Sequence, residues 1–395
     1  MIVTDGSVPS RFIAEVGFDS RDTRTERCES VTIDRLDLTT KLYQPSIFPE
    51  VARVAGGERS ESPTVVDLDP TTFCDLACPE CISGKLLNQG RFSAQRLEAL
   101  AGELVTMGVK AVILIGGGEP LAHRGTRSVI HTLGEAGIAL GVVTNGTMIE
   151  QNLPGLARYA SWIRVSMDAA TTETYRLFRP NRKGESVFDR VVANMRLFAR
   201  AKTGALGYSF LVMSREEADG TVLSNHDEVL QGAELAKDIG CDYFEVKAMF
   251  DEQHHIVGIS EQMRESIDTQ IEKARYLESA DFQIINSSTL TSLQEREGPI
   301  QEKEYRTCRV TELRTLVTPS GVYVCPYHRG NPAARLGDAV TESLVDIWQK
   351  SDRSIVDPSR DCRFHCARHR SNLEMDEIAA GRGRAVLDND TDLFI

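Results

Sequence analysis

The chain has 395 residues, of which 41% are hydrophobic and 26% are charged, and its formal net charge is −13. This length and balance are typical of a globular protein with a sizeable core and more than one structural unit. The negative charge argues against DNA or RNA as the main partner, and no apolar run is long enough to span a membrane. The amino terminus, MIVTDGSVPSRF, lacks the basic start and apolar core of an export signal. We therefore expect a cytoplasmic protein without a nucleic-acid or membrane partner.

Residues 1–63 are polar and weakly periodic, so we predict an N-terminal extension there, with 30–33 as a candidate short strand. From residue 64, short β-branched runs alternate with helical stretches. The predicted strands span residues 64–69, 111–116, 139–144, 162–168, 207–213 and 243–249. The predicted helices span residues 93–107, 124–136, 148–159, 186–202, 226–239 and 260–278. This alternation predicts an α/β fold with a parallel sheet, here a partial (βα)6 TIM-like barrel over residues 64–285.

Three cysteines follow the first predicted strand, in Cys74-Asp-Leu-Ala-Cys78-Pro-Glu-Cys81. Their spacing lets one short loop present three thiolates to one inorganic cluster. A [4Fe–4S] cube bound by three cysteines keeps one iron free to bind another molecule. Zinc also accepts thiolates, but its structural sites usually take paired ligands from separate turns. Chemistry in such barrels is carried by the loops at the C-terminal strand ends, where this loop is expected.

The cysteine spacing resembles the CxxxCxxC signature of the radical S-adenosylmethionine (SAM) enzymes, in which the open iron chelates SAM and one electron cleaves SAM to a 5′-deoxyadenosyl radical. The run Gly116-Gly-Gly-Glu-Pro120, which closes the second predicted strand, is similar to the GGEP motif of that family. The resemblance implies that Cys74, Cys78 and Cys81 are the catalytic cluster ligands. It also implies that Gly117, Gly118 and Glu119 contact the amino group of SAM. Alone, a glycine run at a strand end is weak evidence, because sharp turns also favour glycine.

Polar residues at two further strand ends are candidate SAM contacts. Thr144-Asn-Gly146 ends the third predicted strand, and alternation places Arg164, Ser166 and Asp168 on one face of the fourth. The resemblance carries Thr144 and Ser166 to SAM-contacting positions, and Asp168 is a candidate partner for ribose hydroxyls. The alternative is that Asn145-Gly146 is only a turn and Ser166 a satisfied core hydroxyl.

The sixth predicted strand carries Tyr243, Glu245 and Lys247 on one face. Charges on the inner face of a barrel are stable only when they pair with each other or with a ligand. Lys247 is therefore a candidate contact for the SAM carboxylate or the substrate, and an internal pair with Glu245 is the alternative. His254 and His255 follow this strand and are candidates for a substrate loop.

The residue before the third cysteine departs from the family pattern. Many relatives carry an aromatic side chain there, against the adenine of SAM, whereas this chain has Glu80. The backbone at Glu80 is still a candidate adenine contact, but we do not expect stacking there. Phe73, just before the first cysteine, is not an obvious replacement.

A second group of cysteines lies beyond residue 285. Its members are Cys308, Cys325, Cys362 and Cys366. The segment resembles the twitch domain, a shortened relative of the SPASM extension that holds one auxiliary [4Fe–4S] cluster, although the gap between Gly321 and Cys325 is one residue shorter than usual. Four cysteines would saturate one cube. A Cys₄ zinc site is the alternative, and His365 or His369 could replace a thiolate. We assign residues 286–372 to this domain and residues 373–395 to a charged, mostly exposed tail.

Two of the nine cysteines, Cys28 and Cys241, belong to neither group. Cys241 lies at the start of the sixth predicted strand, away from the expected chemistry, so we predict a buried and inert thiol. The clustering of the other cysteines fits cluster binding in a reducing compartment better than disulfides.

Taken together, the motifs predict a radical SAM enzyme with SAM, two [4Fe–4S] clusters and a reduced flavodoxin or ferredoxin-type electron donor. We expect hydrogen abstraction from a small polar substrate (a sugar, aminocyclitol or nucleoside-like molecule) in natural-product biosynthesis. A fully ligated second cluster and the lack of an evident hydrogen-donating thiol favour net dehydrogenation. The alternatives are epimerisation or elimination on the same substrates, maturation of a ribosomal peptide, and a non-catalytic cluster or zinc protein.

Overall fold

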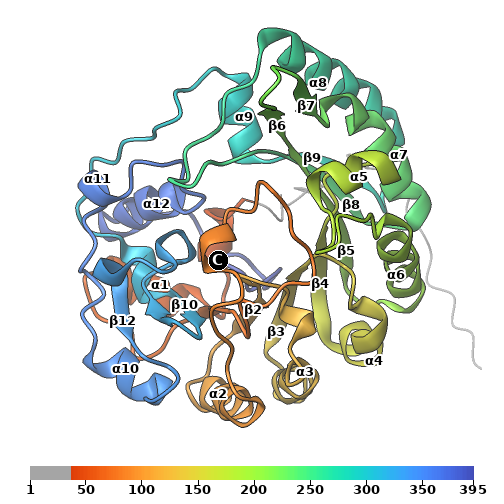
Figure 1. The fold of residues 1–395 in the computed structure, drawn as a ribbon. Coiled ribbons are helices and arrows are strands. Elements are labelled where there is room, and N and C mark those ends of the chain that lie inside the picture. Colours follow the sequence, from red (N-terminus) through yellow and green to blue (C-terminus); the bar gives the residue numbers. More distant parts are fainter. Residues whose placement is uncertain (1–36) are drawn as a thin grey trace, which may run out of the picture. The chain divides into compact units, whose positions relative to one another are not determined.

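The computed structural model describes residues 37–395, so Cys28 and the candidate strand at 30–33 lie outside the described residues. A sheet with the strand order β12-β11-β10-β1-β2-β3-β4-β5-β8-β9 forms the centre of this part (Figure 1). Its strands are β1 (Val65–Leu68), β2 (Ala111–Leu114), β3 (Ala139–Thr144), β4 (Ala160–Ser166), β5 (Ala205–Val212), β8 (Tyr243–Ala248), β9 (Gln283–Asn286), β10 (Arg314–Thr318), β11 (Gly321–Tyr323) and β12 (Arg335–Gly337). Neighbouring strands from β10 through β9 pair in parallel, and β11 and β12 are added antiparallel.

The predicted strands and helices of the barrel region are all present. The helices are α2 (Ala94–Thr106), α3 (Thr126–Glu135), α4 (Ile149–Tyr159), α6 (Phe188–Ala201), α7 (Val229–Ile239) and α8 (Glu261–Ala274). Alternate strand residues such as Val66 and Val112 are buried in one cluster with helix residues such as Leu100. Because each parallel strand must be covered by a helix to bury this face, the α/β class follows from the alternation and is confirmed.

Several elements escaped the sequence analysis. They are α5 (Thr172–Phe178), the hairpin of β6 (Ser214–Glu216) and β7 (Val222–Ser224), and the pair β9 and α9 (Ser288–Gln294). β9 pairs in parallel with β8 and is followed by α9, so one further βα unit extends past the predicted limit of the barrel at residue 285. The segment Gln283-Ile-Ile-Asn286 is neither an apolar run nor an alternating pattern, so it gave no strand signal. The predicted boundary at residue 285 falls within β9, and the domain limits stay predictions.

The second face of the sheet holds a separate apolar cluster. It joins Val65 and Ile113 to side chains from the N-terminal helices η1 (Thr40–Tyr43) and α1 (Phe48–Ala55) and from α12 (His369–Ala379). Phe394 also belongs to it, and its ring lies 5.1 Å from that of Trp162 on β4. Residues 379–386 are exposed as predicted for the tail, but Phe394 and Ile395 are buried, so that prediction was wrong for the last residues.

The cysteine-bearing C-terminal segment is built onto the same sheet. β10 pairs with β1, and Arg314 on β10 forms a buried bidentate pair with Asp67 on β1, with N–O distances of 2.7 and 2.8 Å. The remaining helices, α10 (Leu344–Lys350) and α11 (Pro358–Asp361), follow β12 along the chain. Among residues 37–395, no helix has both the length and the apolar character that a membrane crossing requires.

Candidate active site

The first three cysteines lie together in the loop that leaves β1, at the C-terminal end of the strand. Burial raises the pKa of the Cys74 thiol to about 12 and that of Cys78 to about 11, and Cys81 raises the pKa of Cys78 further. The guanidinium of Arg179 acts in the opposite direction and lowers the pKa of Cys78. Three thiolates so close together need a compensating metal charge, which a cluster of iron ions supplies.

The glycine run brings the β2 loop into contact with the cysteine loop. The backbone N–H of Glu119 donates to the carbonyl of Phe73 at 2.8 Å, and a Cβ atom built on Gly118 would lie 2.2 Å from that carbonyl oxygen. The N–H of Gly117 donates to Asp69 Oδ2 at 2.7 Å. The close approach expected of these glycines is therefore present, and its partner is the backbone before Cys74. Their contact with SAM stays a prediction.

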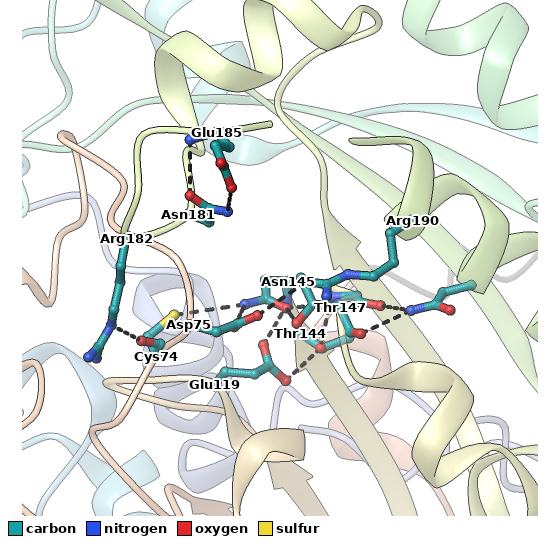
Figure 2. Close-up of polar contacts among 12 residues, drawn as sticks. Cys74, Asp75, Glu119, Thr144, Asn145, Thr147, Asn181, Arg182, Glu185 and Arg190 are labelled. Carbon is teal, nitrogen blue, oxygen red and sulfur yellow. Dashed lines mark hydrogen bonds and ion pairs between the residues drawn. The ribbon is translucent and has the colours of Figure 1, made fainter. Parts of the chain in front are cut away.

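Glu119 is fully buried and its carboxylate accepts three hydrogen bonds, of which those from Thr144 and Asn145 are drawn in Figure 2. The donors are Thr144 Oγ1 and the backbone N–H of Asn145, both at 2.7 Å, and the N–H of Leu121 at 3.0 Å. Burial raises the pKa of Glu119 to about 7. The hydroxyl of Thr144 also accepts from the N–H of Gly146 at 3.0 Å. These side chains tie the ends of β2 and β3 together, and whether either also contacts SAM stays a prediction.

Asn145 is a site residue that the sequence analysis treated only as part of a turn. Its Nδ2 donates to Asp75 Oδ1 at 2.8 Å and lies 3.8 Å from Cys74 Sγ (Figure 2). Its Oδ1 accepts from the N–H of Thr147 at 2.9 Å, which fixes the orientation of the amide. Arg182 donates through Nε to the carbonyl of Cys74 at 3.0 Å. The position of Asn145 at a strand end was a usable signal, whereas Arg182 lies in a loop without a motif.

On β4 the predicted alternation is present. Val165 and Met167 are buried in the outer core, and Ser166 is half-buried on the other face. The contact of Ser166 with SAM stays a prediction. Asp168 lies just beyond the strand, where it accepts from the N–H of Leu211 at 2.8 Å and from the guanidinium of Arg179. Its predicted ribose contact is untested.

The polar face of β8 forms the internal pair that the sequence left as an alternative. Lys247 Nζ lies 3.0 Å from Glu245 Oε2, and Arg164 Nη1 lies 3.4 Å from the same oxygen. Burial lowers the pKa of Lys247 to about 8. Two cations thus share one carboxylate on the inner face. The role of Lys247 toward SAM or substrate stays a prediction.

The two histidines after β8 have different partners. His255 Nδ1 lies 3.4 Å from Asp251 Oδ2. The ring of His254 packs edge-on against Tyr327 and Phe364, with centroid distances of 5.4 and 5.7 Å. His254 therefore connects the loop after β8 to the segment that carries the second cysteine group.

Glu80 is tied to an element that the sequence did not predict. Its carboxylate pairs with Arg215 Nη1 on β6 at 2.7 Å, and the Arg215 guanidinium lies 5.4 Å from the ring centre of Phe178. Phe73 is 41% exposed and lies under the guanidinium of Arg182 at 4.6 Å. The backbone contact of Glu80 with adenine is untested, and its side chain holds the β6–β7 hairpin near Cys81.

The second cysteine group comes together from three loops. Cys308 precedes η6 (Arg309–Glu312), Cys325 precedes η7 (Pro326–His328), and Cys362 and Cys366 follow α11. Burial raises the pKa of Cys308 to about 11, and Cys366 raises it further. Burial raises the pKa of Cys362 to about 12, and Cys308 and Cys366 raise it further. Burial also raises the pKa of Cys325 well above its usual value, and the other three thiols of the group add to this rise.

The imidazole beside these thiols is neither of the two that the sequence suggested. His365 Nε2 lies 2.8 Å from the carbonyl of Gly298, and His369 stacks on Tyr305 at 5.6 Å. His328 instead lies with Nε2 3.3 Å from Cys362 Sγ. Its position three residues after Cys325 was the only sequence signal for it.

The donor chemistry of both groups fits iron–sulfur cubes, which cysteine thiolates bind. Within residues 37–395, no three His, Cys, Asp or Glu side chains converge tightly enough to hold a single metal ion. A Cys₄ zinc site at the second group stays the alternative to a cube.

The barrel region is similar in sequence to known proteins. Residues 68–229 match the family model described as the radical SAM superfamily. The AdoMet-dependent heme synthase of Methanosarcina barkeri is 25% identical over 193 residues, which are 47% of this chain and 51% of the relative. The GTP 3′,8-cyclase of Ectopseudomonas mendocina is 28% identical over 192 residues, which are 47% of this chain and 54% of that relative. The chain thus spans about half the length of these curated relatives.

Solved structures share the fold over a larger part of the chain. SuiB of Streptococcus suis bound to S-adenosylmethionine has a TM-score of 0.54 and 16% identity, covering 73% of this chain and 66% of SuiB. The structure of anSMEcpe with bound AdoMet and a Cp18Cys peptide has a TM-score of 0.55 and 15% identity, covering 81% of this chain and 97% of that chain. At these identities the similarity is one of fold.

Proposed function

The chain belongs to the radical SAM superfamily through its residues 68–229, and from that premise we propose that it is a two-cluster enzyme that removes two electrons from a small polar substrate. Membership of the superfamily brings one [4Fe–4S] cluster and SAM. The second cluster, the substrate class and the oxidative outcome are the content of the proposal. The observation that carries it is the second group of four thiols.

Each cluster has its own residues. Cys74, Cys78 and Cys81 would hold the first, and Cys308, Cys325, Cys362 and Cys366 the second. When bound, the two clusters supply the electron that cleaves SAM and an acceptor for the electron left on the substrate. The protein holds the reacting C–H bond in place and excludes water. Ser166 and the backbone at Gly117 and Gly118 orient SAM, while Asn145 and Arg182 hold the loop at Cys74.

The positions of two candidate hydrogen donors, Cys241 and Tyr208, favour oxidation over epimerisation. Cys241 lies outside both groups, just before β8 begins; it is 5% exposed, and burial raises its pKa above the usual range. Tyr208 on β5 belongs to the outer core and donates to the carbonyl of Ala169. Cys241 therefore lies at the end of β8 away from the cysteine loop, and Tyr208 lies on the face of the sheet that the helices cover.

The inner face supports a polar substrate. Arg164, Glu245 and Lys247 place three charged groups on the inner face, and Arg164 lies two residues after Trp162, which packs on Phe394. A hydroxyl- or amine-rich molecule can replace the water that such groups lose. A peptide is the second candidate substrate, because structures of this fold were solved with a precursor peptide (SuiB) and with a Cp18Cys peptide (anSMEcpe).

The test is anaerobic turnover in deuterated buffer with SAM, a reductant or reduced flavodoxin, and a panel of amino sugars, cyclitols, nucleosides and peptides. We expect 5′-deoxyadenosine and a product two electrons more oxidised than a small polar substrate, with one SAM consumed per turnover. The variant with Cys74, Cys78 and Cys81 all changed to Ala should form no 5′-deoxyadenosine. Solvent deuterium at an inverted carbon, lost in Cys28→Ser or in Tyr208→Phe, would establish epimerisation instead. Turnover of peptides alone would establish the second candidate.

A further inference from the structure

Three of the four thiols in the second group accept hydrogen bonds from nitrogen donors. His328 Nε2 lies 3.3 Å from Cys362 Sγ, Asn372 Nδ2 lies 3.4 Å from Cys308 Sγ, and the backbone N–H of Arg368 lies 3.3 Å from Cys366 Sγ. Arg368 contributes only its backbone, and Asn372 also bonds the carbonyl of residue 368 at 3.0 Å. His328 is thus the donor that can be removed with least effect on the other contacts.

The contacts around His328 determine which ring nitrogen carries the proton. The N–H of Ala333 donates to Asn331 Oδ1 at 3.0 Å, so the other end of that amide is Nδ2. Asn331 Nδ2 lies 3.3 Å from His328 Nδ1. Because an amide nitrogen can only donate, Nδ1 must accept, and the proton of the neutral ring lies on Nε2. His328 therefore donates to Cys362 Sγ.

The same arrangement argues against His328 as a metal ligand. A protonated Nε2 has no free lone pair for iron, and Nδ1 is occupied by Asn331. His328 is 6% exposed and is held between Cys325 and Asn331, with its N–H donating to the carbonyl of Cys325 at 3.2 Å. Its ring packs edge-on against Phe364 at 6.1 Å. The ring can thus hold its proton against Cys362 without rearrangement.

We propose that the hydrogen bond from His328 to Cys362 raises the reduction potential of the auxiliary cluster. The inference rests on the proposed function, because it requires that cluster to be present. A donor beside a ligand sulfur stabilises the more negatively charged, reduced form relative to the oxidised form, and hydrogen bonds to sulfur are among the factors that set cluster potentials. A higher potential makes the cluster a better acceptor for an electron from substrate. Asn331 acts through His328 as a positioning residue.

The experiment is a redox titration, followed by electron paramagnetic resonance, of the full chain in which Cys74, Cys78 and Cys81 are changed to Ala, so that only the auxiliary cluster contributes. Into this background we would introduce His328→Phe, His328→Gln, Asn331→Ala and, as a matched histidine control, His369→Phe. We expect His328→Phe to shift the reduction equilibrium at least tenfold toward the oxidised form, about 59 mV for one electron. His328→Gln, which offers an amide N–H, should recover part of the shift, and Asn331→Ala should give a smaller shift of the same sign.

Iron content separates failure of the inference from failure of the proposed function. About four iron atoms per chain in the background with His328 intact establish the auxiliary cluster, and their absence would reject the cluster and the inference with it. With the cluster present, an unchanged potential in both His328→Phe and Asn331→Ala would overturn the role of the hydrogen bond. Loss of iron in His328→Phe together with loss in His328→Gln would instead assign His328 as a ligand. A shift of equal size in His369→Phe would show that the change is not specific to Cys362.

Discussion

The contact between the glycine run and the cysteine loop allows a quantitative test with Gly118→Ala. The added Cβ would lie 2.2 Å from the Phe73 carbonyl oxygen and 2.5 Å from the Thr72 carbonyl carbon. Both are backbone atoms, so the loop must move. Overpacking costs about 1–3 kcal/mol, and losing the bond from the Glu119 N–H to Phe73 costs about 1 kcal/mol. We expect the free energy of unfolding to fall by about 2–4 kcal/mol.

The assay combines urea unfolding of the apo chain with iron analysis after anaerobic reconstitution. Because Cys74 follows Phe73 directly, moving the loop should also remove about four of about eight iron atoms and leave the auxiliary cluster intact. Gly102→Ala is the matched control, since its Cβ would meet nothing within 4 Å in helix α2. Alanine there should stabilise the helix by about 0.5–1 kcal/mol. If Gly118→Ala has the same free energy of unfolding as the control Gly102→Ala and keeps its iron, the close contact is not required.

Three further predictions concern single side chains. Because burial raises the pKa of Glu119 to about 7, above its value in the unfolded chain, its contribution to stability should be fully present below about pH 4.5 and lost as pH rises through 7. Urea titrations of Glu119→Gln from pH 4 to 8 should lack this decline. If the stability of the variant falls with pH as steeply as that of the unchanged chain, the decline does not come from Glu119. Arg314→Met should lower the free energy of unfolding by about 3–5 kcal/mol, because it leaves Asp67 buried and unpaired. Adding Asp67→Leu should recover part of the lost stability. If the double variant recovers none, the unpaired carboxylate is not the cause of the loss. Ser166→Ala should weaken SAM binding by about 1 kcal/mol in calorimetry, whereas the control Ser128→Ala, a half-buried serine on α3, should not. Equal affinities of the two variants for SAM would exclude the contact.

Much of the barrel was readable from local sequence. The runs that became β2, β3 and β8 carry β-branched or alternating residues between helical stretches, and their positions agree with the predicted ones. The spacing of Cys74, Cys78 and Cys81 is equally local, because three ligands in one loop need no knowledge of the rest of the chain. β9 escaped because Gln283-Ile-Ile-Asn286 is neither an apolar run, as β2 is, nor an alternating pattern, and its membership of the sheet depends on β8.

The site shows the same division. Residue type and spacing along the chain were enough to identify which residues could bind metal and which strand ends carried polar groups. Three contacts required the folded chain: Asn145 against Cys74, His328 rather than His365 against Cys362, and Phe394 against Trp162. Each of these contacts joins residues far apart in the chain through loops or chain ends without periodicity. Their geometry depends on how the strands pack, which short-range preferences do not encode.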